Sequence, residues 1–182
     1  MVEIRFHGRG GQGGVTSAEL TALAAIEQGK FAQAFPSFGP ERRGAPVMAF
    51  VRVSDQQIRT REKVYNPNIV VVLDPTLLQI VNVEAGVPQD GIVVVNTRLS
   101  ANELRKTMGL TRRLAVVDAS TIAVETLRVP ITNTTMLGAL IKATGVITLD
   151  ALRGPVEKRF GPIAEKNLRA CQRAYEETVV EE

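Results

Sequence analysis

The sequence is poor in the side chains that build most metal and redox sites. Its 182 residues include one cysteine, one histidine and no tryptophan. A single cysteine cannot form an intramolecular disulfide, a cysteine-ligated zinc site or a cysteine-held iron–sulfur cluster. A single histidine also makes a histidine-based metal centre or a serine–histidine site difficult to build. We therefore expect this chain to contribute no catalytic residue and no metal ligand.

The sequence also lacks a strong charge of one sign and a long hydrophobic run. Its 22 lysines and arginines against 19 acids leave a net charge of +3, without the dense basic stripe of a dedicated nucleic-acid binder. Apolar runs such as Ile69–Leu73 are far too short to cross a bilayer. The N-terminal MVEIRFHG does not resemble a signal peptide. We expect a cytoplasmic chain with neither a nucleic-acid nor a membrane partner.

What is present is the pattern of an α/β protein. Apolar residues make up 45% and charged residues 23%, which suits a globular chain with a sizeable core. Short β-branched runs, typical of buried parallel strands, alternate with helical stretches. The predicted strands are Ile69–Leu73, Ile92–Val95 and Leu114–Val117, and the predicted helices are Pro75–Val83 and Ala101–Met108. We predict one Rossmann-like domain over residues 1–182, with a mixed sheet, an antiparallel hairpin and C-terminal helices.

The ends of the chain complete this prediction. The N-terminal part is expected to form a strand, a helix and a second strand, at Val2–Phe6, Val15–Gln28 and Phe31–Phe35. The hairpin is predicted from Val47–Ser54 and Ile58–Thr60, which flank Asp55-Gln56-Gln57. From Asn133 onward the pattern indicates helices, one beginning near Asp150 and another after Pro162.

A glycine-rich segment follows the first predicted strand. Gly8, Gly10 and Gly13 spell G-x-G-x-x-G at the start of the first predicted helix; we call residues 8–13 the glycine loop. Glycine permits a tight turn and a close backbone approach, and free N–H groups at a helix start favour an anion. The pattern therefore predicts a phosphate or pyrophosphate ligand. The alternative is that the glycines only allow the loop to pack against something bulky, such as another subunit.

A dinucleotide is a weaker fit to the same loop. An NAD site needs an acidic residue about 20 positions past the glycines, and the segment FAQAFPS at residues 31–37 has none. Arg42 and Arg43 could instead meet a 2′-phosphate, so a freestanding NADP- or nucleotide-binding oxidoreductase domain is one alternative. A Walker loop is excluded because no Gly-Lys-Ser/Thr follows the glycines.

The segment PSFGPERRGAP, residues 36–46, is the least generic in the chain, and we call it the arginine loop. Its three prolines restrain the backbone, and Arg42 and Arg43 supply two adjacent guanidinium groups. Phe38 adds apolar area. Such a loop could hold a phosphorylated ligand or dock into a partner. The alternative is a solvated connection in which Glu41 neutralises one arginine.

Four motifs together resemble one known family. HGRGGQGG, AQAFPSFGPERRGAP, NPNIVVVLD and NTTMLGALIKATG are similar to segments of the gamma subunit of 2-oxoacid:ferredoxin oxidoreductases, a group that includes the pyruvate synthase gamma chains. The likeness runs from about Phe6 to Gly145. It implies a share in a hetero-oligomeric enzyme that converts a 2-oxoacid, most often pyruvate, and coenzyme A to acyl-CoA and carbon dioxide while reducing ferredoxin.

The resemblance also implies where the cofactors lie. Thiamine diphosphate, magnesium and 4Fe–4S clusters are expected on partner subunits of the alpha, beta and delta types. The sequence agrees, because it has no Gly-Asp-Gly…Asn-Asn pattern for thiamine diphosphate and its one cysteine cannot ligate a cluster. We expect this chain to hold no cofactor by itself, to carry no redox centre and to be inactive alone.

The two loops then suggest a role for the chain within such an enzyme. Coenzyme A carries several negative charges on its 3′-phospho-ADP moiety, which suits backbone donors and arginines. The residues expected to bind it are Gly8, Arg9, Gly10, Gly11, Gln12, Gly13, Arg42 and Arg43. The competing hypothesis is that both loops mainly form a subunit interface, in an assembly subunit that binds no small molecule.

Four other polar residues attract attention. Asp74 and Asp118 each follow a predicted strand, where ligands gather in open α/β sheets, but we expect them to cap the next helix. His7 is expected to be a hydrogen-bonded loop histidine without an acid–base role. Cys171 falls on the apolar face of the last helix, so we expect it to be an inert packing residue.

Overall fold

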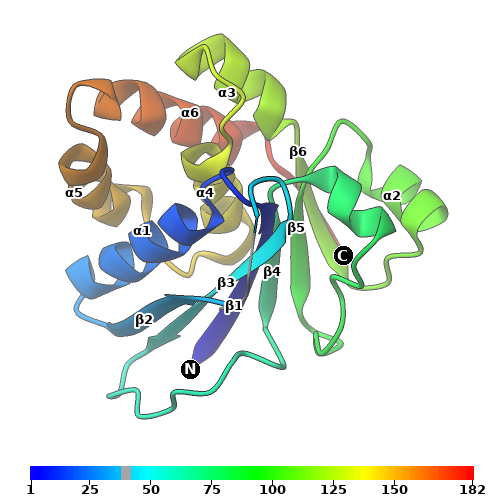
Figure 1. Ribbon diagram of the computed structural model, residues 1–182, viewed down its shortest axis with the longest axis horizontal. Coiled ribbons are helices and arrows are strands. Elements are labelled where there is room, and N and C mark those ends of the chain that lie inside the picture. The colour runs from blue at the N-terminus through cyan, green and yellow to red at the C-terminus, as the bar shows by residue number, and fades with distance from the viewer. Residues whose placement is uncertain (38–41) are drawn as a thin grey trace.

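A mixed β-sheet organises the computed structural model, which describes residues 1–37 and 42–182 (Figure 1). Across this described part the sheet has seven strands in the order β2-β3-β1-β4-β5-β6-β7. Strands β1, β4, β5 and β6 are parallel, whereas β2, β3 and β7 pair with their neighbours in the antiparallel sense. The strands span Val2–Arg9, Phe31–Pro36, Pro46–Ser54, Ile69–Val72, Ile92–Asn96, Arg113–Val117 and Val179–Glu181, numbered β1 to β7 in chain order.

Helices cover both faces of this sheet (Figure 1). The larger layer contains α1, α3, α4, α5 and α6, which span Gly14–Glu27, Ala119–Leu127, Asn133–Thr144, Leu149–Phe160 and Ala164–Glu177. Helix α2, Ala101–Met108, packs on the opposite face. Two short 3-10 turns, Pro75–Gln79 and Gly161–Ile163, complete the elements of residues 1–37 and 42–182. No helix in the described ranges is long and apolar enough to span a membrane.

The β-branched runs have apolar side chains at every position because both faces of the sheet are covered. In β4, Ile69 and Val71 face the larger helical layer, whereas Val70 and Val72 face the α2 layer. This is the arrangement expected of parallel strands buried on both sides. The predicted Rossmann-like mixed sheet with C-terminal helices is confirmed, and the predicted parallel strands lie where the sequence places them.

The position of the predicted hairpin was wrong. Residues 58–60 form no strand; instead β3 pairs with β1 on one side and with β2 on the other. The hairpin is therefore β2–β3, and the arginine loop is its connection. The segment after β3 is tied to that strand by Arg52, whose buried guanidinium donates to the carbonyl oxygens of Glu62 and Lys63.

Two further details differ from the sequence-based expectation. Pro75–Val83 was predicted to be a helix, but only the 3-10 turn Pro75–Gln79 forms there. The carbonyl of Val83 is instead an acceptor for the guanidinium of Arg5, which fixes the chain in an irregular path. Strand β7 was not predicted; its three residues pair with the edge of β6 after the last helix.

Candidate functional site

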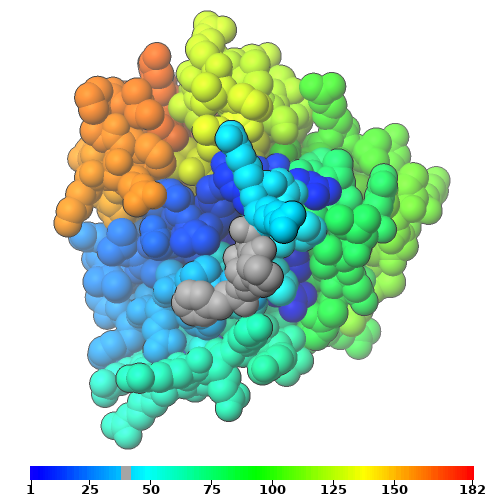
Figure 2. Space-filling model, viewed as in Figure 1, coloured from blue at the N-terminus to red at the C-terminus, as the bar shows by residue number. Residues whose placement is uncertain are grey.

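The glycine loop and the arginine loop lie against each other at one end of the sheet. The backbone N–H of Gly10 donates to the carbonyl of Ala45 at 2.9 Å, and that of Gly44 donates to the carbonyl of Gly10 at 3.2 Å. In Figure 2 the cyan segment that starts at residue 42 lies against the dark blue N-terminal segment. The two segments singled out by sequence are thus brought together, while the predicted contributions of Phe38 and Glu41 lie outside the described residues.

Close packing requires glycine at two positions of the glycine loop. A Cβ atom on Gly10 would lie 2.9 Å from the carbonyl oxygen of Arg42, which is too close for a relaxed contact. Gly13 has a φ of 82°, in the left-handed region, and a Cβ there would lie 2.6 Å from Nδ2 of Asn133. The sequence predicted such close approaches, but it gave no sign that Asn133, at the start of α4, would be the neighbour.

The first turn of α1 supplies the electrostatic character of the site. The helix begins at Gly14, directly after the glycine loop, so its first N–H groups have no acceptor within the helix. These groups and the aligned peptide dipoles make a helix start favourable for an anion. The first turn carries no acidic side chain that would oppose this effect. The local sequence thus places a partial positive charge at the end of the glycine loop.

A cavity of about 390 Å³ opens beside this helix start. Its walls come from the glycine loop, from the first turn of α1, and from the facing ends of β2 and β3. Val15, Thr16 and Ser37 are among the lining residues. Arg42 and Arg43 are exposed next to it, and Nε of Arg43 lies 4.0 Å from the position that a Cβ on Gly11 would occupy. The cavity and the exposed arginines beside the glycine loop suit a negatively charged group.

Arg9 is placed differently from the two exposed arginines. Its Nε lies 3.2 Å from Oδ2 of Asp74, its Nη1 donates to the carbonyl of Gly44 at 3.1 Å, and its Nη2 donates to Oγ1 of Thr76 at 3.0 Å. The Arg9 side chain is 28% exposed. The guanidinium therefore connects the glycine loop with Gly44 and with the segment Asp74–Thr76. The sequence alone did not predict these hydrogen bonds within the protein.

Gln12 fixes the shape of the glycine loop. Its Oε1 accepts a hydrogen bond from the backbone N–H of Arg9 at 2.6 Å, and its Nε2 donates to Oδ2 of Asp74 at 2.9 Å. Gly8, at the other end of the loop, packs close to Leu73, since a Cβ on Gly8 would lie 3.2 Å from Leu73 Cδ1. The side chains of Arg9 and Gln12 thus hold the backbone of the loop in place, and Arg9 also lines the cavity.

The predicted caps are confirmed for both aspartates. Asp74 accepts from the backbone N–H of Thr76 at 2.9 Å, and Asp118 accepts from that of Thr121 at 3.0 Å. Burial alone would raise the pKa of Asp74, but hydrogen bonds from Thr76 and Gln12 and the charge of Arg9 hold that pKa below its ordinary value. Both carboxylates are therefore ionised at neutral pH.

His7 is not a loop residue, contrary to the prediction from sequence. It lies within β1, is 3% exposed and accepts a hydrogen bond from Nε of Arg5 at 2.9 Å. Burial and the neighbouring charge of Arg5 lower the pKa of His7 to about 3. The imidazole is therefore neutral at physiological pH. The strand alternation places His7 and Arg5 on the same face of β1.

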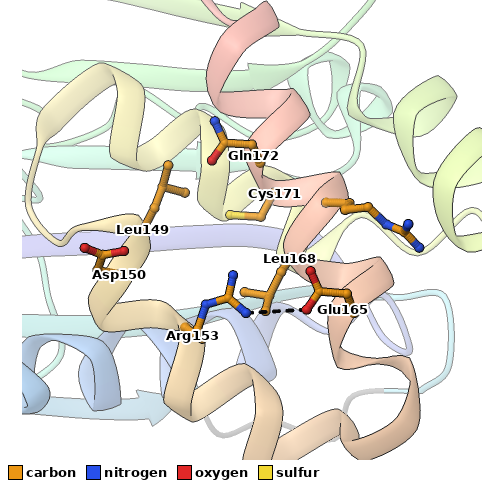
Figure 3. Close-up of a pocket in the computed structure, with 8 residues that line it drawn as sticks. Leu149, Asp150, Arg153, Glu165, Leu168, Cys171 and Gln172 are labelled. Carbon is orange, nitrogen blue, oxygen red and sulfur yellow. Dashed lines mark hydrogen bonds and ion pairs between the residues drawn. The ribbon is translucent and has the colours of Figure 1, made fainter.

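A second cavity lies between α5 and α6, away from these loops (Figure 3). It measures about 200 Å³, and Arg153 and Glu165 form an ion pair across it at 3.4 Å. Cys171, which lines this cavity, is 1% exposed, and burial raises the pKa of its thiol to about 12. A protonated, buried thiol is a poor nucleophile, which agrees with the predicted packing role.

Across residues 1–37 and 42–182, no three or more histidine, cysteine, aspartate or glutamate side chains are grouped to hold a metal ion. The loop site offers backbone N–H groups and guanidinium groups as hydrogen-bond donors. Its geometry suits an anion such as a phosphate ester.

Comparison with known sequences gives the same family as the four motifs. A family model described as pyruvate ferredoxin/flavodoxin oxidoreductase matches residues 3–177. The chain is 52% identical over 182 residues to the "Pyruvate/ketoisovalerate oxidoreductases common subunit gamma" of Pyrococcus abyssi, covering 99% of this chain and 98% of that relative. It is 51% identical over 178 residues to the "Pyruvate synthase subunit PorC" of Methanothermobacter thermautotrophicus, with 97% and 96% covered.

A solved structure extends the likeness to three dimensions. The fold matches the crystal structure of the pyruvate oxidoreductase subunit PORC from Thermotoga maritima with a TM-score of 0.89 and 43% sequence identity. The match covers 100% of this chain and 98% of that one. The resemblance inferred from the motifs is thereby confirmed. The chain belongs to the pyruvate ferredoxin/flavodoxin oxidoreductase family, among its gamma-type subunits.

Proposed function

We propose that this chain is the non-redox gamma subunit of an enzyme that oxidatively decarboxylates a 2-oxoacid, pyruvate in the first place, with coenzyme A and ferredoxin. Support comes from the relatives, which are named as subunits of pyruvate/ketoisovalerate oxidoreductase and of pyruvate synthase. Partner subunits of the alpha, beta and delta types hold thiamine diphosphate, magnesium and the 4Fe–4S clusters. The single cysteine of this chain fits that division, because a cluster needs several cysteine ligands.

Within that enzyme, the glycine loop and the arginine loop help to position coenzyme A. The observation that carries this proposal is the pair of backbone hydrogen bonds between Gly10 and residues 44 and 45, which brings two exposed arginines to the start of α1. A helix start stabilises a nearby anion by only about 0.3–1 kcal/mol at an exposed site. Hydrogen bonds to charged groups contribute about 1.5–3 kcal/mol each. Arg42 and Arg43 therefore supply most of the attraction.

The eight predicted site residues divide into three groups in this proposal. Arg42 and Arg43 contact the phosphates directly, together with N–H groups of the loop and of the first turn of α1. Arg9 and Gln12 keep the loop in shape, because their side chains are already hydrogen-bonded to Asp74. The glycines permit the close approach of the ligand and of the arginine loop.

Kinetics of the assembled complex test this proposal. Arg42→Ala and Arg43→Ala variants are compared with Arg61→Ala, an exposed arginine in the connection between β3 and β4 at the opposite end of the sheet. We expect each of the first two variants to raise the KM for coenzyme A by roughly tenfold, the loss of one charge-assisted hydrogen bond. The KM for pyruvate and the assembly of the complex should stay as in the unmodified enzyme.

The interface hypothesis predicts a different result for the same variants. Val15, in the first turn of α1, is an apolar side chain that is 37% exposed at this end of the sheet. If the arginine loop serves only as an interface, Arg42→Ala and Arg43→Ala weaken assembly, measured by native mass spectrometry, and leave the KM for coenzyme A unchanged. That outcome would refute the direct contact with coenzyme A.

A further inference from the structure

The carboxylate of Asp74 connects segments that are far apart in the sequence. Oδ2 of Asp74 accepts from Nε of Arg9 at 3.2 Å and from Nε2 of Gln12 at 2.9 Å. Oδ1 accepts from the backbone N–H and the hydroxyl of Thr76, at 2.9 and 2.6 Å. The two oxygens therefore have separate tasks: Oδ1 caps the 3-10 turn, and Oδ2 holds the glycine loop.

The contact continues from the glycine loop to the arginine loop. The same guanidinium that meets Asp74 donates through Nη1 to the carbonyl of Gly44 at 3.1 Å. Gly44 in turn donates its N–H to the carbonyl of Gly10. Asp74, Arg9 and Gly44 thus form one connected path from the end of β4 to the arginine loop. The path is partly shielded from water, since the side chains of Arg9 and Asp74 are 28% and 14% exposed.

A carboxylate at this place needs an explanation, because a negative charge close to an anion site weakens the binding of an anion. The capping role does not explain why this residue is charged. An uncharged serine or asparagine is also a good N-cap residue and would not repel the ligand. The charge becomes useful when it orients a guanidinium, since charge-assisted hydrogen bonds are shorter and stronger than neutral ones. The ion pair also neutralises both groups, so the net local charge remains that of Arg42 and Arg43.

Asp118 offers a natural comparison within the same chain. It follows β6 as Asp74 follows β4, caps the next helix through Thr121, and pairs with an arginine, Arg98, at 3.2 Å. The Arg98 side chain is 80% exposed, and within residues 1–37 and 42–182 it contacts Asp118 and Thr121. The two aspartates therefore share the capping role, and only Asp74 is connected to the proposed coenzyme A site.

We infer that Asp74 is a positioning residue of this site: through Arg9 it holds the glycine loop and the arginine loop together as one receptor for phosphate groups. The inference rests on the proposed function, in which these loops position coenzyme A. Asp74 does not touch the ligand in this arrangement. It fixes the distance between the backbone N–H groups at the start of α1 and the guanidinium groups of Arg42 and Arg43.

The variant Asp74→Asn separates the two tasks of the carboxylate. An asparagine keeps an oxygen for the Thr76 N–H but presents an NH₂ group to Arg9 and Gln12, where an acceptor is needed. Asp118→Asn is the matched control, since it makes the same change at the other cap. Arg9→Met removes the same contact from the other side, together with the hydrogen bonds of Arg9 to Gly44 and Thr76, and leaves both capping aspartates in place. All three variants are studied in the assembled complex.

Two measurements are made on each variant. The first is steady-state kinetics, with the KM for coenzyme A, the KM for pyruvate and kcat determined separately. The second is amide hydrogen exchange of the peptide that covers residues 42–46, which reports the hold on the arginine loop without any coenzyme A. In Asp74→Asn and Arg9→Met, we expect faster exchange in this peptide and a rise in the KM for coenzyme A of roughly tenfold. The KM for pyruvate and kcat should change by less than about twofold, and Asp118→Asn should leave all of these values unchanged.

The outcomes distinguish this inference from the proposed function. Unchanged exchange at residues 42–46 in Asp74→Asn overturns the inference, and so does an equal rise in the KM for coenzyme A in Asp118→Asn. A combined Asp74→Asn and Arg9→Met variant should lose less than the sum of the two single losses, because both variants remove the contact between Asp74 and Arg9; fully additive losses also overturn the inference. The coenzyme A assignment itself fails on the Arg42→Ala and Arg43→Ala kinetics, whatever the exchange at residues 42–46 shows.

Discussion

Replacing Gly10 by alanine is the most direct test of the close approach between the two loops. The new methyl group would lie 2.9 Å from the carbonyl oxygen of Arg42, whereas ordinary contacts of a Cβ begin at 3.4 Å. The arginine loop must therefore move by several tenths of an ångström. That movement disturbs the two backbone hydrogen bonds that Gly10 forms with Gly44 and Ala45. The substitution thus acts on the relative position of the donors without removing any of them.

The size of the effect follows from those two bonds. Each contributes about 0.5–1.5 kcal/mol net, so weakening both costs about 1–2 kcal/mol. If that energy is lost from the anion site, the affinity for coenzyme A falls by roughly 5- to 30-fold. The assays are the KM for coenzyme A in the assembled complex and the thermal unfolding midpoint of the same preparation. The KM for pyruvate should change little, since no step in this reasoning involves the 2-oxoacid.

Gly109→Ala is a suitable control for this measurement. Gly109 ends α2 with a φ of 69°, and no atom lies within 4 Å of the position its Cβ would take. Alanine there costs about 1–2 kcal/mol through backbone strain alone, a loss of stability similar to that expected for Gly10→Ala. Gly109→Ala should lower the unfolding midpoint and leave the KM for coenzyme A unchanged. Equal KM values for Gly10→Ala and the unmodified enzyme would refute the reasoning.

Two further predictions concern stability. A Cβ on Gly138 of α4 would overlap the backbone carbonyl of Cys171 on α6. Gly138→Ala should therefore lower the free energy of unfolding by about 3 kcal/mol, measured by denaturant unfolding. A loss below about 1 kcal/mol would contradict the close packing of these two helices. The pKa of His7 falls from 6.5 to about 3 on folding. The contribution of neutral His7 to the free energy of unfolding is therefore fully present above pH 6.5 and is lost as the pH falls toward about 3. The slope from this residue reaches at most about 1.4 kcal/mol per pH unit, and His7→Gln should remove it from the measured pH profile.

The sequence predicts the central part of this fold because local pattern and burial agree there. In Ile92–Asn96 every residue is buried, and an apolar β-branched run of this length suits a parallel strand covered on both faces. The capping box at Ser100 and Glu103 is likewise local, and the structure contains both of its hydrogen bonds. Where the residues that decide a structure are neighbours in the chain, sequence reasoning is sufficient.

The errors lie where distant residues decide the structure. Residues 58–60 have the composition of a strand, yet the partner of β3 on that side is β2, which comes earlier in the chain. The sequence could place Asp74 at the same end of the sheet as the glycine loop, since the parallel strands β1 and β4 end together. It could not show that the free oxygen of the cap would take Arg9 and Gln12, because that depends on side-chain geometry across 62 to 65 residues.

The order of the strands also has a consequence for how the site forms during folding. The first strand of the chain lies inside the sheet, with Ile4 opposite Val51 on one side and Ile69 on the other. Such non-local pairings form slowly, because a long stretch of chain must close before they are made. The site then needs Gly10, Gly44 and Asp74 in place at once, so it exists only after both neighbours of β1 have been added. A ligand bound at this site can therefore stabilise only chains whose sheet centre is complete, and its binding would favour the finished subunit over partly folded forms.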